Sequence, residues 1–280
     1  MILPSASQIQ SQVTEALTED VGAGDLTASL IDSNTLAQAT VISRESAVVC
    51  GVAWFNEVFA QIDSAVEIDW AVVDGDEVEA DQVLCRIHGL ASSVLTAERT
   101  ALNFLQTLSA TASKAAEYVK AVEDTGVRIL DTRKTIPGLR MAQKYAVTCG
   151  GASNHRMGLH DAILIKENHI ESAGTVTAAL HRAFAEHPNV EIEIEVETHE
   201  QLEEALAAGV KRVLLDNMSL PQLREAVEIN QGRARLEASG GVNLDTVRDI
   251  AQTGVDDISV GEITKDIRAI DFSMRFVAEA

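Results

Sequence analysis

The second half of the chain alternates short apolar runs with segments of helical periodicity, and this alternation restricts the fold more than any other feature. The segments between the runs, such as VTAALHRAFAEH and EQLEEALAAG, repeat apolar residues at helical spacing. The alternation predicts parallel strands joined by crossover helices. We expect a βα barrel, with a doubly wound sheet as the alternative, and both folds bind ligands at the carboxyl ends of their strands. The runs cover residues 127–134, 161–169, 190–198, 211–218, 234–241 and 255–262.

The first third of the chain follows a different pattern. Residues 5–20 place apolar side chains on one face of a helix, and residues 36–90 read as short strands broken at glycines, with a helix at NEVFAQI. A long helical pattern over residues 92–122 is expected to lead from this small mixed sheet domain into the second domain.

Charge and composition exclude several classes of protein. The formal net charge is −21, from 43 acidic and 22 basic side chains, which disfavours nucleic acid and anionic membranes as partners. We find no signal peptide and no apolar stretch of about 18 residues that could cross a membrane. Three widely spaced cysteines form no metal-binding pair and favour a reducing compartment, so we expect a cytoplasmic protein. The default interpretation of Cys50, Cys85 and Cys149 is a buried structural thiol.

One segment reverses the overall charge. Residues 128–169 hold seven basic side chains against three acidic ones, together with His155, His160 and His169. A solvated basic face is the alternative, but several of these residues end apolar strand runs. An inward-facing basic cluster needs anions, and arginine pairs with carboxylates and phosphates through two hydrogen bonds.

The run VEIEIEVET places acids on one face of a strand and apolar residues on the other. Glu191, Glu193, Glu195 and Glu197 share one parity. If the apolar face meets the helices, the glutamates point into the barrel and need cationic partners, for which Lys134 and Lys166 are candidates. An edge strand with a wet acidic face is the alternative.

Strand ends further along the chain suggest how a substrate is held. Glu197 and Asp216 could bind Mg²⁺, through water, or hydrogen-bond sugar hydroxyls. The turns ASGG (238–241) and SVGE (259–262) could cradle a phosphate with their backbone N–H groups, with tight turns alone as the alternative. A site with many cations, two acids and a phosphate cradle indicates anionic substrates, at least one of them phosphorylated.

These phrases together resemble the quinolinate phosphoribosyltransferase family. The matching phrases follow the family's order over nearly the whole chain, and DTRKT-PGLR followed by NHR-GL-D--LIK-NH is highly specific. They are EDVGAGDLT (19–27), ERTALNFLQTLSATAS (98–113), DTRKTIPGLR (131–140), KYAVTCGGASNHRMGLHDAILIKENHI (144–170), EVET (195–198), LLDNM (214–218), EASGGV (237–242) and ISVGEIT (258–264).

The resemblance implies a fold and a reaction. The fold is an open α/β sandwich over residues 1–110, to which the tail 268–280 returns, followed by an incomplete barrel over residues 111–267, as in type II phosphoribosyltransferases. The reaction converts quinolinate and phosphoribosyl pyrophosphate into nicotinate mononucleotide, pyrophosphate and CO₂, with Mg²⁺, as a step of NAD biosynthesis. The resemblance also implies a homodimer, with hexamers as a further possibility.

The resemblance carries roles to individual residues. Lys134 is expected near the reacting carbon, and Glu197 and Asp216 at the ribose hydroxyls or Mg²⁺, so that these three act in catalysis. Arg99 is expected to reach the site from the partner subunit. Glu262 departs from the pattern, in which a small residue is commoner, and we expect its carboxylate to turn away from the phosphate. Thr132 is expected among the substrate-binding residues. The quinolinate site comprises Arg133, His155, Arg156 and Lys166, and the 5′-phosphate site Ser239, Gly240, Gly241, Val260, Gly261 and Glu262.

Other classes of function remain open at this point. A barrel aldolase could use Lys134 or Lys166 as a Schiff-base amine, although a lysine among arginines suits ion pairing better. A related transferase could take another acceptor. A non-enzymatic carrier is disfavoured because the sheet domain holds no lysine before Lys114.

Overall fold

A computed structural model describes residues 3–277, which divide into two compact units. The first unit comprises the described residues up to Ala116, Ile136–Gly151 and those from Asp266 onward. The second comprises Glu117–Thr135 and Ala152–Lys265. Within residues 3–277, no helix combines the length and the apolar character needed to cross a membrane.

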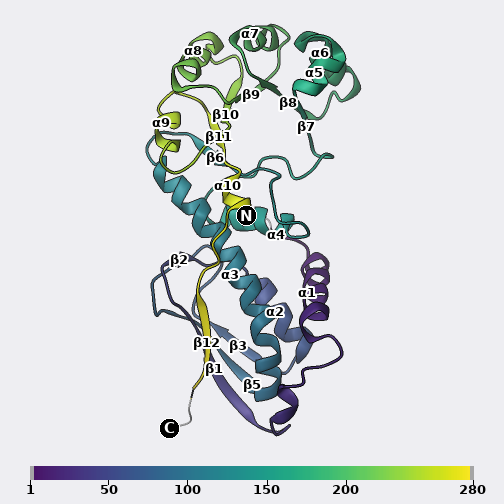
Figure 1. Ribbon diagram of the computed structural model, residues 1–280, viewed down its shortest axis with the longest axis vertical. Coiled ribbons are helices and arrows are strands. Elements are labelled where there is room, and N and C mark those ends of the chain that lie inside the picture. Colours follow the sequence, from purple (N-terminus) through teal and green to yellow (C-terminus); the bar gives the residue numbers. More distant parts are fainter. Residues whose placement is uncertain (1–2, 278–280) are drawn as a thin grey trace. The chain divides into compact units, whose positions relative to one another are not determined.

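An antiparallel sheet forms the base of the first unit (Figure 1). Its strand order is β12-β1-β5-β3, and a separate ribbon pairs β2 with β4. Ala39, Val41 and Ile87 are buried on one face of the sheet, whereas Arg86 and His88 are exposed on the other. The strands are β1 (Leu36–Ser43), β2 (Ala47–Val48), β3 (Glu67–Trp70), β4 (Glu77–Val78), β5 (Val83–Leu90) and β12 (Phe272–Phe276).

The helices of this unit supply most of its apolar core. Trp54, Phe55 and Phe59 of α2 are almost completely buried, as are Leu105 and Leu108 of α3. The predicted amphipathic helix is α1, which begins at a capping box formed by Ser5 and Gln8. The helices are α1 (Ala6–Val21), the 3₁₀ turn η1 (Ala28–Leu30), α2 (Val52–Ile62), α3 (Ala91–Ala121), whose last turn belongs to the second unit, and α4 (Arg140–Cys149).

Six parallel strands form the second unit in the order β6-β11-β10-β9-β8-β7. They are β6 (Arg128–Leu130), β7 (Ala162–Ile165), β8 (Glu191–Val196), β9 (Arg212–Asp216), β10 (Arg235–Ser239) and β11 (Asp257–Ser259). The connecting helices are α5 (Glu167–Ala173), α6 (Val176–Glu186), α7 (His199–Ala207), α8 (Leu220–Asn230) and α9 (Val247–Ala251), which lie outside the strands (Figure 1), and α10 (Glu262–Lys265) follows β11.

The strand order distinguishes the two predicted architectures. Strands β7 to β11 are neighbours in sequence order, and β6 pairs with β11 rather than β7. A doubly wound sheet would reverse its order at a switch point, whereas this order describes a barrel with one gap, between β6 and β7. Each of the six predicted runs contains one strand, so the incomplete barrel is confirmed.

The division into units differs from the predicted boundaries at residues 111–116, 136–151 and 266–267, all of which belong to the first unit. The tail returns as predicted, since β12 pairs with β1. Residues 136–151, however, pack with the first unit, although the prediction assigned them to the barrel. The cause is a set of contacts along α4, in which a Cβ at Gly150 would lie 2.1 Å from the Ala112 carbonyl oxygen and Tyr145 bonds to Asp74.

Asp74 joins the start of α2 to α4. Its Oδ1 accepts the N–H groups of Gly51 and Val52 at 2.9 and 3.0 Å, and its Oδ2 accepts the Tyr145 hydroxyl at 2.9 Å. These bonds satisfy donors at a helix N-terminus, where a carboxylate is also favoured by the helix dipole.

We expect Asp74→Ala to lower the free energy of unfolding by about 2–3 kcal/mol, because three partly buried donors lose their acceptor. Urea unfolding followed by circular dichroism measures the change. Asp69→Ala, at an exposed position of β3, is the control and should change stability by less than about 0.5 kcal/mol. Equal stability of the two variants would show that Asp74 does not hold these elements together.

Candidate active site

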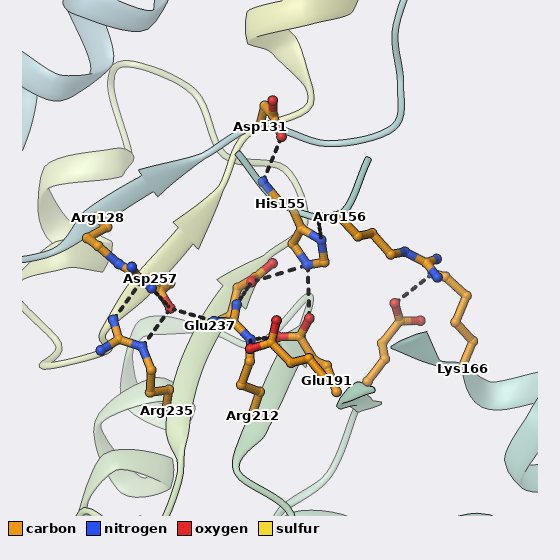
Figure 2. A network of polar contacts seen from close by, with 12 residues as sticks. Arg128, Asp131, His155, Arg156, Lys166, Glu191, Arg212, Arg235, Glu237 and Asp257 are labelled. Atoms are coloured by element: carbon orange, nitrogen blue, oxygen red, sulfur yellow. Dashed lines mark hydrogen bonds and ion pairs between the residues drawn. The ribbon is translucent and has the colours of Figure 1, made fainter. Parts of the chain in front are cut away.

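A layer of charged side chains fills the barrel interior near the amino ends of its strands. Arg212 of β9 lies at the centre of this layer (Figure 2). Its guanidinium donates to Glu237 of β10 at 3.1 Å and lies 3.5 Å from carboxylate oxygens of both Glu191 and Glu193 of β8. A further contact of 3.6 Å reaches Asp257 of β11. One cation therefore connects carboxylates from three other strands.

Asp257 is completely buried and is held by two more arginines. Arg128 of β6 and Arg235 of β10 each donate two hydrogen bonds to its carboxylate, at 2.8 to 3.1 Å. Burial alone would raise the pKa of Asp257, but the hydrogen bonds from Arg128 and Arg235 hold it below its usual value. Bidentate pairs of this kind fix geometry as well as charge.

His155 connects this layer to the loop that carries Arg156. Its Nε2 lies 2.9 Å from Glu193 and 3.5 Å from Glu237, while its Nδ1 accepts the backbone N–H of Arg156 at 2.7 Å. The fully buried Asp131 accepts the backbone N–H of His155 at 2.8 Å. Because Nδ1 is an acceptor, the proton of the neutral ring resides on Nε2 and faces Glu193.

Two groups in this cluster titrate at unusual pH. Burial, together with the neighbouring Glu193, raises the pKa of Glu237 to about 7. Burial opposes the charged form of His155, but Glu193 and Glu237 outweigh it and raise the pKa of His155. Ligand atoms of His155, Glu193 and Glu237 lie within 4.8 Å of one another, as metal ligands do. Because Arg212 already contacts both glutamates, we interpret the cluster as an ion-pair network.

The acidic face of β8 points into the barrel, as the parity of VEIEIEVET predicted. Lys166 donates to Glu195 at 2.7 Å, which confirms one of the two predicted partners. The other predicted partner was Lys134. The structure instead pairs Glu193 with Arg212 and His155. Arg212 carries no signal in the sequence beyond its place at the start of a strand.

Three of the predicted carboxylate-binding cations line one cavity of about 510 Å³. They are Arg133, Arg156 and Lys166, and the apolar part of the wall includes Leu159 and Ile163. Burial and the neighbouring Arg133 guanidinium lower the pKa of Arg156. A bound anion would relieve that repulsion, so the cavity is suited to a planar, negatively charged ligand. His155 lies instead in an adjacent cavity of about 250 Å³, which Arg156 also lines.

Glu197, Asp216 and Ser239 lie side by side at the carboxyl ends of three adjacent strands. Asp216 pairs in register with Ser239, and Leu215 with Val196, so Glu197 follows β8 directly beside Asp216. Gly240 and Gly241 then turn with φ of +98° and +61°, a conformation that disfavours side chains. Two carboxylates beside a hydroxyl and a glycine turn could bind a hard cation or sugar hydroxyls.

The loop after β6 is anchored to the last predicted phosphate turn. Thr132 Oγ1 accepts the Lys134 N–H at 3.1 Å, and Thr264 donates to the Lys134 carbonyl at 2.8 Å. A Cβ at Gly261 would lie 3.0 Å from Lys134 Cδ, so glycine leaves room for the lysine here. The preceding residue, Val260, is buried.

Glu262 turns toward α3, and its predicted orientation away from a bound phosphate stays a prediction. Its carboxylate accepts the Tyr118 hydroxyl at 2.8 Å. Arg99 is exposed on α3 in the first unit, and its role across an interface stays a prediction.

The comparison with known proteins settles the family. A model of the quinolinate phosphoribosyl transferase N-terminal domain matches residues 25–109, and one of the C-terminal domain matches residues 111–275. The chain belongs to the quinolinate phosphoribosyltransferase family. A relative from Bacillus subtilis, described as a probable carboxylating nicotinate-nucleotide pyrophosphorylase, is 38% identical over 95% of this chain and 93% of its own length.

Other relatives agree with this assignment. A decarboxylating quinolinate phosphoribosyltransferase from Nicotiana tabacum is 39% identical over 94% of this chain and 81% of its own length. The solved nicotinate-nucleotide pyrophosphorylase from Francisella tularensis is 44% identical, covers 98% of both chains and superposes with a TM-score of 0.96. The human nicotinic acid phosphoribosyltransferase, at 13% identity and a TM-score of 0.62, shares the fold.

The raised pKa of Glu237 predicts how stability depends on pH. Its ordinary value is 4.5, so between pH 4.5 and about 7 the folded state binds more protons than the unfolded state, and stability falls as pH rises. This one group contributes up to about 3 kcal/mol to that fall. Glu237→Gln removes the titration, and we expect a shallower decline of the free energy of unfolding from about pH 5 to pH 8.

Urea unfolding at several pH values measures the slope. Glu191→Gln, which also contacts Arg212 but is 63% exposed, is the control and should keep the wild-type slope. Parallel curves for wild type and Glu237→Gln would contradict the assignment of the titration to Glu237.

Proposed function

We propose that this chain transfers the phosphoribosyl group of phosphoribosyl pyrophosphate to quinolinate, releasing pyrophosphate and CO₂ and forming nicotinate mononucleotide for NAD biosynthesis. The observation that carries the proposal is the convergence of Arg133, Arg156 and Lys166 on one cavity in a chain of net charge −21. The activities named for the relatives from Bacillus subtilis and Nicotiana tabacum support it.

The cavity matches the chemistry of the acceptor. Quinolinate is a flat pyridine with two adjacent carboxylates, and two arginines and a lysine can neutralise both charges while fixing the plane of the ring. Apolar side chains such as Ile163 provide a surface for the ring. Holding the pyridine nitrogen toward the sugar removes much of the entropic part of the barrier.

Glu197 and Asp216 act on the phosphoribosyl donor. Departure of pyrophosphate builds positive charge on the ribose, and neighbouring carboxylates stabilise that charge. Their oxygens are also the donors that Mg²⁺ prefers, so the two residues fit the expected metal, which would neutralise charge on the leaving pyrophosphate when bound. We assign the 5′-phosphate to the turns at Ser239–Gly241 and Val260–Glu262, and a position beside the reacting carbon to Lys134, which lies over Gly261.

The carboxyl group at C2 is lost after transfer. Once the ring nitrogen carries the ribose it is positively charged, so when the bond to the carboxylate breaks and CO₂ leaves, the electron pair stays on C2 beside that charge, which stabilises it. C2 then takes a proton from water to give nicotinate mononucleotide. The chain's own contribution to this step is placement of the ring. We further propose that the protein acts in the cytoplasm as a homodimer, with Arg99 of one subunit completing the carboxylate site of the other.

The reaction is tested by a direct assay in which purified protein, quinolinate, phosphoribosyl pyrophosphate and Mg²⁺ are combined. Nicotinate mononucleotide and CO₂ should form in equal amounts. A folded protein that binds phosphoribosyl pyrophosphate but forms neither product would indicate a different acceptor.

Arg156→Ala should weaken quinolinate binding at least tenfold, since a charge-assisted hydrogen bond is lost from a partly buried site. Calorimetric titration measures it, and affinity for phosphoribosyl pyrophosphate should stay within about twofold of wild type. Arg182→Ala is the matched control, because Arg182 lines the same cavity but is 75% exposed and paired with Glu186. Equal losses in the two variants would remove Arg156 from the carboxylate site.

The shared site predicts complementation between inactive subunits. Arg99→Ala and Lys166→Ala homodimers should each be nearly inactive, whereas mixed dimers contain one site that carries neither substitution. After subunit exchange verified by native mass spectrometry, activity should approach about one quarter of the wild-type value, because half of the dimers are mixed and each has one intact site. Exchange without recovery would place Arg99 and Lys166 in the same site of one chain, or Arg99 outside it.

A further inference from the structure

Asn217 occupies a left-handed backbone conformation directly after Asp216. Its φ is +53°, which asparagine tolerates better than most residues. Its side-chain Nδ2 donates to Asp216 Oδ2 at 2.7 Å. The carboxylate that ends β9 is therefore oriented by the next residue in the chain.

The same residue also contacts the glycine turn after β10. The Asn217 N–H donates to the Ser239 carbonyl at 3.0 Å. A Cβ built on Gly240 would lie only 2.1 Å from Asn217 Oδ1 and 2.9 Å from its backbone nitrogen. Gly240 thus leaves the space that the asparagine side chain fills, in addition to adopting a φ of +98°.

The geometry points to Asn217 as a positioning residue for the phosphoribosyl donor. Its amide holds the Asp216 carboxylate and packs against the Ser239–Gly241 turn, so one side chain connects the group assigned to the ribose and metal with the group assigned to the 5′-phosphate. This inference rests on the proposed function, because it takes Asp216 and the turn to be the donor site. Asn217 itself acts through these groups.

The chemistry of the position restricts the residues that can serve. Aspartate would place a second carboxylate beside Asp216 and repel it. Alanine would adopt a positive φ at a cost and supply no donor. Glycine retains the backbone conformation and removes only the amide. Asn217→Gly therefore distinguishes the effect of the side chain from the effect of the backbone turn.

A simpler explanation is that Asn217 only permits a tight turn after β9. Gln231 provides the matched control, because it also has a positive φ, +50°, and is exposed at the end of α8, outside the residues assigned to substrates. If the turn alone matters, Asn217→Gly and Gln231→Gly should behave alike in every assay.

We expect Asn217→Gly to raise the dissociation constant of phosphoribosyl pyrophosphate with Mg²⁺ about tenfold, as loss of one charge-assisted hydrogen bond predicts. Quinolinate affinity should stay within about twofold, and the melting temperature should match that of Gln231→Gly. Calorimetric titration and thermal unfolding give these values. Asn217→Asp should lower the affinity for phosphoribosyl pyrophosphate further, because the new carboxylate repels Asp216.

A double-mutant cycle tests whether Asn217 acts through Asp216. In an Asp216→Ala background, Asn217→Gly should lower the affinity for phosphoribosyl pyrophosphate by less than about threefold, since the carboxylate that Asn217 orients is gone. Equal effects in both backgrounds, or donor affinity of Asn217→Gly at the wild-type value, would overturn the assignment.

If wild type fails to bind phosphoribosyl pyrophosphate at all, the proposed function falls and this inference with it. If wild type binds the donor but forms no nicotinate mononucleotide, only the acceptor is wrong and the cycle still decides the role of Asn217.

Discussion

The interior of the barrel depends on Arg212. Strand β8 buries Glu193 and Glu195 inside the barrel, where uncompensated carboxylates would cost several kcal/mol each. The Arg212 guanidinium contacts carboxylates from β8, β10 and β11, and Arg128 and Arg235 complete the layer at Asp257. Barrels of this class are usually filled by branched apolar side chains. Here a charge network replaces part of that packing, and its directional bonds fix the relative register of five strands, β6 and β8 to β11.

The charged layer also positions the segment that carries Arg156, one of the cations proposed to bind the acceptor. His155 is bonded to Glu193 at one ring nitrogen and to the Arg156 backbone at the other, and Asp131 holds the same segment from β6. Both ring nitrogens are therefore engaged by the protein itself, so in this arrangement His155 orients the loop that carries Arg156. The arginine side chain is left to line the anion cavity. Charges near the amino ends of the strands thus organise the side chains assigned to the substrates.

Much of this arrangement could be predicted because it depends on local pattern. Period-two alternation placed the glutamates of β8 inward, and the ends of apolar runs located Lys166, Asp216 and Ser239 at the carboxyl ends of parallel strands. Arg212 and Asn217 could not be found in this way. The role of Arg212 arises from lateral neighbours on β8, β10 and β11, which are distant in sequence. That of Asn217 arises from a positive φ and a contact with Gly240. The placement of α4 depended on packing against α3, which periodicity does not encode.

The ion pair between Lys166 and Glu195 argues against the alternative in which Lys166 forms a Schiff base. An amine nucleophile must lose its proton, which requires an apolar site or a neighbouring cation. Lys166 instead donates to Glu195 at 2.7 Å and is 45% exposed, so its site is open to water and holds a carboxylate partner. An ammonium ion-paired with Glu195 can neutralise a substrate carboxylate but cannot attack a carbonyl. The same pairing keeps Glu195 compensated before any substrate binds, so the anion enters a site whose cations are already positioned.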